Sequence, residues 1–101
     1  MDSDAARRIA QGYQRFADQC DGWIDDAKEL QRLSGFGGLT SAQQLQQGFE
    51  RKAFGLVEVL QSMKAAALRM AAGYLQAGEL FEEVDAMNAR ALKAAVQEVD
   101  S

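Results

Sequence analysis

The chain has 101 residues, of which 48% are hydrophobic and 26% are charged, and it contains neither proline nor histidine. This length and composition are typical of one small globular domain. The formal net charge of −4 comes without any block of basic residues, which argues against nucleic acid as a partner and against insertion into or binding to an anionic membrane.

The first predicted element is a helix over about residues 3–34. Its apolar side chains recur at steps of three or four residues, at positions 6, 9, 13, 16, 20, 23, 27 and 30. This spacing places them in one heptad stripe along the helix. Charged residues such as Asp25 and Asp26 lie on the opposite face, as in a helix that packs against one neighbour.

A glycine-rich segment, SGFGGLTS, follows this helix. Each glycine in a helix interior costs about 1 kcal/mol relative to alanine, so three of them in four positions predict a turn, at residues 35–40. Thr40 and Ser41 precede Gln43 and Gln44 by three residues. Either pair forms a capping box, which predicts that a second helix begins near residue 41.

The second predicted helix is longer and covers about residues 41–90. Its apolar residues also step by three or four: Leu45, Phe49, Ala53, Leu56, Leu60, Met63, Ala67, Met70, Tyr74, Ala77, Phe81 and Val84. Gly73 and Gly78 are expected to weaken this helix without ending it. The net negative charge falls entirely after Gly78, and we expect residues 91–101 to form a frayed acidic tail.

Two helices joined by a short turn are expected to pack as an antiparallel hairpin, in one domain over residues 1–101. At about 1.5 Å per residue, the first helix can cover the second only to about residue 72. The remaining 18 or so residues, roughly 27 Å of helix, would overhang with an exposed apolar stripe. The expected fold is therefore all-α, a two-helix hairpin with a longer second helix that assembles as a four-helix bundle dimer.

The residue inventory gives little support for catalysis. Without histidine, the commonest general base and the usual zinc ligands are missing, and the single cysteine, Cys20, has no histidine to activate it. Cys20 lies on the apolar stripe, where a buried thiol is its expected role. We expect no enzyme, no cofactor and no metal site.

Phe81 and Asp85 are the most distinctive pair in the expected overhang. Their spacing of four residues puts an aromatic ring and a carboxylate one helical turn apart on the same surface. Such a pair suits recognition by a partner. The same spacing is also compatible with an ordinary stripe residue followed by a solvated acid.

Several features occur together in this chain: its length, two predicted helices, Phe36-x-Gly38 in the turn, and a late aromatic-x-x-x-acid element. In this combination the whole chain resembles the WXG-motif (Esx-type) substrates of type VII, or ESX, secretion, whose turn carries Trp-x-Gly. The segments SGFGGLTSAQQLQQGFERKA and FEEVDAMNARAL are most similar to the actinobacterial EspC-like branch. Tails in that branch carry tyrosine or phenylalanine, three residues, and then an acid.

The resemblance implies a helical hairpin that pairs with itself or with a sister hairpin. It implies synthesis in the cytoplasm and secretion by the type VII route without a cleaved signal peptide, and the N-terminal MDSDAARRIA indeed lacks an apolar run. By position, Phe81 and Asp85 would form the secretion signal read by the type VII ATPase or a chaperone. Phe36, in place of the family's tryptophan, and Gly38 would form the turn motif.

The expected function is that of a small non-enzymatic interaction protein that dimerises through its helical stripes and presents a C-terminal export signal. Its partner interface is expected to use large apolar residues: Tyr13, Phe16, Trp23, Leu56, Leu60, Met63, Met70, Tyr74, Leu80 and Val84. One alternative is a targeting partner that binds the helical N-terminus of a larger type VII-secreted toxin. Another is an intracellular coiled-coil adaptor or antitoxin-like protein that is not exported.

Overall fold

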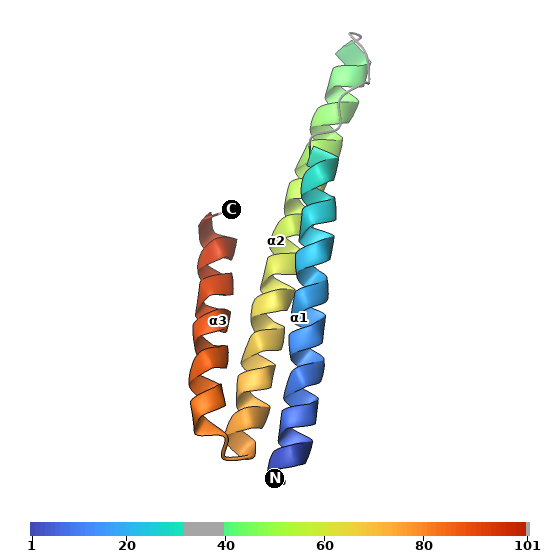
Figure 1. The fold of residues 1–101 in the computed structure, drawn as a ribbon. Coiled ribbons are helices and arrows are strands. Elements are labelled where there is room, and N and C mark those ends of the chain that lie inside the picture. The colour runs from blue at the N-terminus through green and yellow to red at the C-terminus, as the bar shows by residue number, and fades with distance from the viewer. Residues whose placement is uncertain (32–39, 101) are drawn as a thin grey trace.

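A computed structural model of the chain describes residues 1–31 and 40–100. These residues form three α-helices, α1 (Ser3–Gln31), α2 (Thr40–Ala77) and α3 (Phe81–Asp100). Figure 1 shows α1 and α2 running antiparallel, with α3 turned back along α2. The molecule measures 61 × 21 × 13 Å, and its radius of gyration of 17.9 Å exceeds the roughly 13 Å of a compact domain of this length. It is therefore a rod.

The start of α1 lies beside the end of α2. The Asp2 carboxylate caps α1 by accepting a hydrogen bond from the backbone N–H of Ala5 at 3.0 Å. The ammonium group of Met1 donates to the carbonyl of Ala77 at 3.1 Å. A positive group is favourable there, because the C-terminal carbonyls of a helix carry partial negative charge.

The prediction of a two-helix hairpin is wrong, because the chain reverses direction at residues 78–80. α2 ends in a Schellman motif. The N–H of Leu80 donates to the carbonyl of Leu75 at 2.9 Å, and the N–H of Glu79 donates to that of Gln76 at 3.0 Å. Glu79 has a φ of 59°, the left-handed conformation that glycine usually supplies at this position.

Gly78 serves this turn through its lack of a side chain. A Cβ atom on Gly78 would lie 2.5 Å from the Cβ of Ala6 and 3.4 Å from the Cα of Ser3. The first turn of α1 therefore approaches the end of α2 more closely than any residue other than glycine at position 78 would allow. In the sequence, this glycine looked only like a weak point in a continuous helix.

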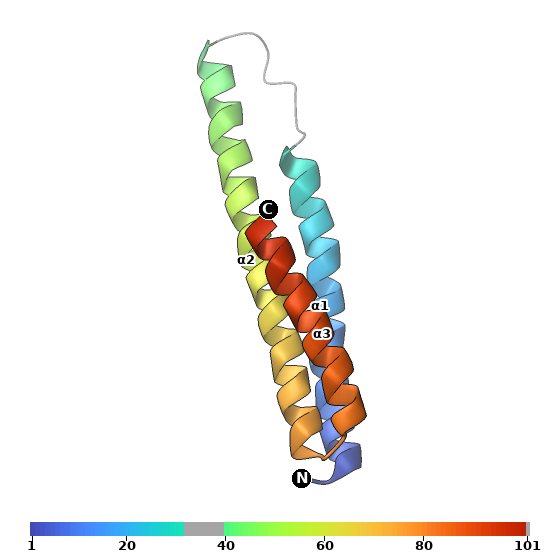
Figure 2. The same ribbon diagram turned by 90° about the vertical axis from the view of Figure 1, so that its left-hand side faces the viewer.

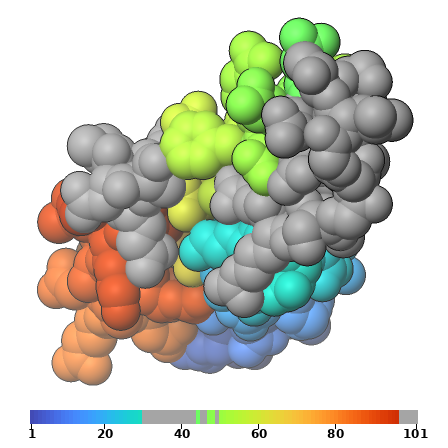
Figure 3. Space-filling view, turned by 90° about the horizontal axis from the view of Figure 1, so that it is seen from above, coloured from blue at the N-terminus to red at the C-terminus, as the bar shows by residue number. Residues whose placement is uncertain are grey.

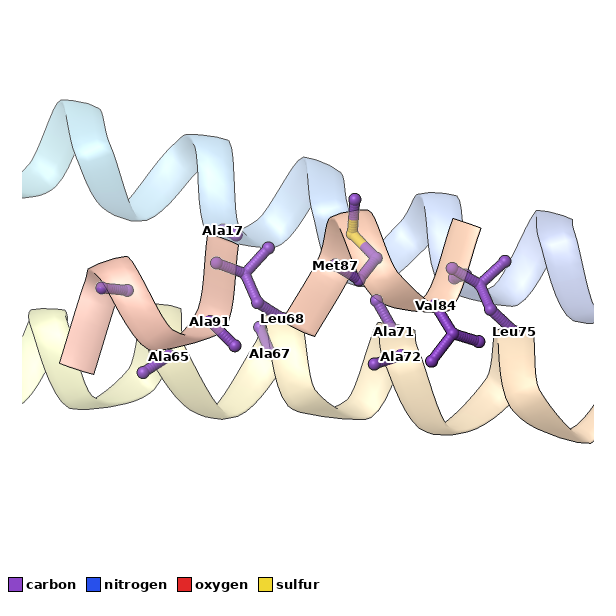
Figure 4. Packing of buried hydrophobic residues seen from close by; sticks show 12 residues of the cluster. Ala17, Ala65, Ala67, Leu68, Ala71, Ala72, Leu75, Val84, Met87 and Ala91 are labelled. Carbon is purple, nitrogen blue, oxygen red and sulfur yellow. The ribbon is translucent and has the colours of Figure 1, made fainter. Parts of the chain in front are cut away.

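The overhang expected beyond residue 72 does not exist, because α3 lies along α2 instead of extending it. Figure 2 shows α3 crossing one face of the α1–α2 pair obliquely. The reversal lets the chain bury Val84 and Met87 against its own α2 (Figure 4). The fold is all-α, with three helices packed α1–α2 and α2–α3. It offers no bare C-terminal helix to complete a four-helix bundle dimer.

The core of this fold is built mainly from alanine. The main cluster contains Leu68, Leu75, Val84 and Met87, and its other members are all alanines: Ala10, Ala17, Ala65, Ala67, Ala71, Ala72, Ala91 and Ala94. A second, smaller cluster joins α1 to α2 through Ile24, Ala27, Val57 and Leu60. Small side chains let helices approach closely, but each removes little apolar area from water.

Ion pairs connect the helices around this core. Arg7 of α1 forms an ion pair with Glu83 of α3, and the Nη2 atom of Arg7 donates a hydrogen bond to Oε1 of Glu83 at 2.9 Å. This hydrogen bond to the carboxylate raises the pKa of the Arg7 guanidinium. Arg90 of α3 lies 3.3 Å from Asp18 of α1. Partly exposed pairs of this kind contribute little stability. They link α3 to α1, and Figure 3 shows the two helices beside each other in the view from above.

Candidate functional site

Phe81 and Asp85 lie together on the outer surface of α3. Phe81 is the first residue of the helix and leaves 60% of its surface exposed, and Asp85 is exposed one turn later. No ion pair engages Asp85 among the described residues. Phe81 therefore does not continue the buried stripe of α2, whereas Val84, three residues later, faces inward and is buried.

The exposed pair belongs to a longer stripe that the sequence analysis missed. Asn88, Leu92 and Val96 continue from Phe81 and Asp85 in steps of three or four residues, so all five share one face of α3. Leu92 is 67% exposed and Val96 is 50% exposed. The sequence alone does not show this outer stripe, because residues 81–90 were predicted to end a continuous helix over about residues 41–90 and residues 91–101 to form a frayed tail.

The other predicted positions are distributed unevenly. Phe36 and Gly38, the expected turn motif, lie outside the described residues. Of the expected partner interface, Leu60 and Val84 are buried within this chain's own core. Tyr13, Phe16, Tyr74 and Leu80 are partly buried against that core. The remaining four are between 39% and 46% exposed: Trp23, Leu56, Met63 and Met70.

Part of the expected interface forms the wall of an apolar groove between α1 and α2. The groove has a volume of about 470 Å³ and is lined by Ile9, Gly12, Tyr13, Phe16, Met63, Ala66, Ala67 and Met70. The tyrosine hydroxyl is the only hydrogen-bonding group among these side chains. Ile9 stood on the predicted stripe, but it was not assigned to the interface. Gly12 and Ala66 were not predicted to belong to an interface, because such small side chains do not stand out in a pattern of large apolar residues.

The groove lies on the side of the α1–α2 pair away from α3. Arg7 and Asp18, the α1 residues that reach α3, are each two positions from a groove residue, Ile9 and Phe16 respectively. Two positions correspond to about 200° around a helix. The outer stripe of α3 and the groove are therefore separate surfaces.

Aromatic contacts hold the shape of the groove. Tyr13 of α1 stacks on Tyr74 of α2, with ring centroids 5.7 Å apart and planes 18° from parallel. Phe16 meets Trp23 edge to face at 6.0 Å along α1. Both geometries are favourable for aromatic pairs. The groove wall therefore consists of fixed rings with flexible methionine side chains opposite them.

The remaining chemistry of the described residues is sparse. Burial raises the pKa of the Cys20 thiol, and neighbouring Asp21 adds to this effect. Within residues 1–31 and 40–100, no three potential ligands are grouped to hold a metal ion. None of the helices described in these ranges contains an apolar stretch of the length that a bilayer span requires. Comparisons with protein-family models, curated proteins and solved structures find no match for this chain.

Proposed function

We propose that this protein is a small non-enzymatic substrate or partner of a type VII-like secretion system, and that α3 presents its export signal. The exposure of Phe81 carries the proposal. Val84 and Met87 turn inward from the same helix, yet Phe81 keeps most of its ring in water beside the Asp85 carboxylate, which no described residue pairs with. Leaving this ring in water forgoes apolar burial within the fold, whereas a receptor would gain an aromatic anchor and a charge.

The proposed mechanism is recognition of a preformed helix. The outer stripe of α3 would enter an apolar groove of the secretion ATPase or of a chaperone, with Phe81, Leu92 and Val96 as anchors. Asp85 would pair with a basic side chain of that receptor. Because α3 is already packed on α2, little conformational entropy is lost when the signal is bound.

Two alternatives differ in what the molecule does besides presenting α3. A targeting partner of a larger type VII-secreted toxin would use the same signal and would also bind the toxin's helical N-terminus. The apolar groove between α1 and α2 favours this version. An intracellular adaptor or antitoxin-like protein would use its apolar surfaces without leaving the cell, so its location would not depend on Phe81 or Asp85.

The test is export of a tagged copy from an actinobacterium with an active type VII system. The signal variant carries Phe81→Ala and Asp85→Ala. The chain offers a matched control in Phe54→Ala with Glu58→Ala, because this pair has the same spacing, is also exposed and lies on α2. Cell-associated protein levels and helicity are compared for all three proteins.

The proposal expects the wild type and the α2 control to reach the culture filtrate, while the signal variant stays in the cells. Equal export of the signal variant would refute a role for Phe81 and Asp85. Retention of the wild type, at matched expression, would refute export by that system and favour the intracellular adaptor. Loss of export in both variants would show that export does not depend specifically on Phe81 and Asp85, which would contradict the proposal.

A further inference from the structure

The groove between α1 and α2 is an uncovered apolar surface on the side of the molecule away from α3. Three of its large lining side chains are substantially exposed: Ile9 at 38%, Met63 at 39% and Met70 at 46%. Trp23, Leu56 and Val59 extend the same faces of α1 and α2 toward the other end of the rod, and they are 42%, 44% and 54% exposed. This surface is long and narrow, so it suits a helix better than a compact ligand.

The charges beside the groove itself are all basic, whereas its extension also carries exposed acids, Asp26 near Trp23 and Glu58 next to Val59. The groove is lined from residues 9–16 and 63–70, and the surrounding residues 5–17 and 59–78 contain five basic residues and no acidic residue. Two of the five, Arg7 and Lys64, pair with acids away from the groove. Arg8, Arg15 and Arg69 are exposed along its edges, and no ion pair engages them among the described residues. An Arg15 guanidinium nitrogen lies 3.7 Å from where a Cβ of Gly12 would stand, directly at the groove wall.

The acids that directly flank the α1 wall are each engaged by another basic residue. Asp4 lies 3.8 Å from Arg7 on the same helix. Asp18 pairs with Arg90 of α3 at 3.3 Å. Asp21 pairs with Lys64 at 2.7 Å. Asp18 and Asp21 are thus paired away from the groove, and Arg8, Arg15 and Arg69 are left beside it.

We infer that this groove binds an amphipathic helix of a partner protein whose apolar ridge is flanked by acidic residues. Bulky side chains of that helix fill the space between Tyr13 and Phe16 on one wall and the two methionines on the other. Its flanking carboxylates meet the three arginines of the rim. The inference goes beyond the proposed role of α3, and it does not depend on export, because the two surfaces lie on opposite sides of the molecule.

A second copy of this chain fits the groove less well. Groove-to-groove pairing about a two-fold axis would place two acid-free, arginine-rimmed surfaces against each other, which is electrostatically unfavourable. The outer stripe of α3 from a second copy carries one carboxylate, Asp85, that could meet an arginine of the rim. However, α3 and the groove lie on opposite sides, so that contact would be head-to-tail and would tend to build open chains.

The test uses two designed helical peptides of about 14–18 residues, a length that spans the surface. Both carry leucine on one face, flanked by glutamate in one peptide and by lysine in the other. Binding to the full chain is measured by fluorescence anisotropy of the labelled peptide at two salt concentrations. The rim variant carries Arg8→Glu, Arg15→Glu and Arg69→Glu. A control variant, Lys28→Glu with Arg51→Glu and Lys93→Glu, changes the net charge equally at exposed positions elsewhere.

We expect the wild type and the control variant to bind the glutamate peptide, more weakly at high salt, and to discriminate against the lysine peptide. The rim variant should bind the glutamate peptide at least about tenfold more weakly and should now accept the lysine peptide. Met70→Glu should abolish binding of the glutamate peptide with no loss of helicity, because Met70 is half exposed.

Several results would overturn the inference. Absence of binding by the glutamate peptide, or equal binding of both peptides, would contradict it. So would an equal loss in the control variant, because the effect would then be one of net charge. Concentration-dependent self-association of the wild type that Met70→Glu abolishes, measured by light scattering, would show that a second copy occupies the groove instead.

Discussion

Two neighbouring residues in the turn between α2 and α3 give the sharpest test of the fold. Gly78→Ala should destabilise the protein. The added Cβ would lie 2.5 Å from the Cβ of Ala6, whereas ordinary contacts begin near 3.4 Å, and neither this methyl group nor the nearby backbone of Ser3 can swing aside. Overpacking of this kind costs about 1–3 kcal/mol. In a continuous helix, the same substitution would instead stabilise by about 1 kcal/mol.

Glu79→Gly should have the opposite effect. Glu79 is exposed and holds a φ of 59°, a conformation that costs an L-residue about 1–2 kcal/mol and costs glycine almost nothing. Part of this gain is lost, because glycine gives the unfolded chain more freedom, so the net stabilisation should be about 1 kcal/mol. In a continuous helix, glycine at this position would destabilise by about 1 kcal/mol.

The pair is measured by thermal and urea unfolding, followed by circular dichroism. For a domain of this size, 1 kcal/mol moves the melting temperature by about 4–8 °C, so both changes are large enough to resolve. The expected order of stability is Glu79→Gly above wild type and wild type above Gly78→Ala. The reverse order of stability would contradict the turn and would support one continuous helix through residues 78–80. A systematic error of measurement would shift both variants in the same direction and so could not reverse the order.

Two further predictions concern the core. Met87→Ala should destabilise the protein by about 2 kcal/mol in urea unfolding, because Met87 is only 9% exposed and packs between α2 and α3. Leu92→Ala, on the exposed face of α3, should change the free energy of unfolding by no more than about 0.5 kcal/mol. Equal effects of the two substitutions would mean that α3 is not packed on α2. Cys20 should react with a thiol reagent only on unfolding. Since burial raises the pKa of Cys20 above its ordinary value of 9.0, its contribution to the free energy of unfolding is complete below that pH and declines as the pH rises beyond it. That decline should be absent in Cys20→Ala, and an equal slope in both proteins would contradict it.

The helical content of this chain could be predicted because it depends on local spacing. Apolar residues at steps of three or four define α1 and α2, and the glycine-rich segment separates them. The reversal at residues 78–80 left no comparable trace. The stripe of α2 continues in phase through Ala77, Phe81 and Val84 even though the direction of the chain changes, and periodicity carries no information on direction.

The usual signals for a helix end were also displaced at this turn. The residue in the left-handed conformation is Glu79, whereas a glycine at that position is the usual signal for a helix end. The glycine of this turn, Gly78, lies one residue earlier. α3 begins after Leu80, which has no side-chain oxygen to cap it. The weaker signals that were present are the hydrophobic pair Leu75 and Leu80, which flanks a Schellman motif, and the acidic first turn of α3.

The candidate surfaces depend on tertiary contacts that spacing cannot resolve. Phe81 stands at a stripe position, and it is exposed only because α3 begins with it after the reversal. The groove requires the faces of α1 and α2 that remain uncovered once α3 occupies the opposite side. Its arginine rim could have been found from the sequence, since residues 5–17 and 59–78 contain no acidic residue, but that fact acquires meaning only when the two segments are known to be adjacent.

The distribution of side-chain sizes explains why partners are expected on both surfaces. Alanines fill most of the interior, while large apolar side chains such as Met70, Phe81 and Leu92 remain in water. An alanine core buries little apolar area per residue, so a rod of 101 residues retains only modest stability of its own. A partner that covers the groove or the outer stripe of α3 would supply the missing burial and would raise the free energy of unfolding by an amount that grows with the logarithm of its affinity. An increase in melting temperature on binding the glutamate-flanked helix should therefore accompany occupation of the groove.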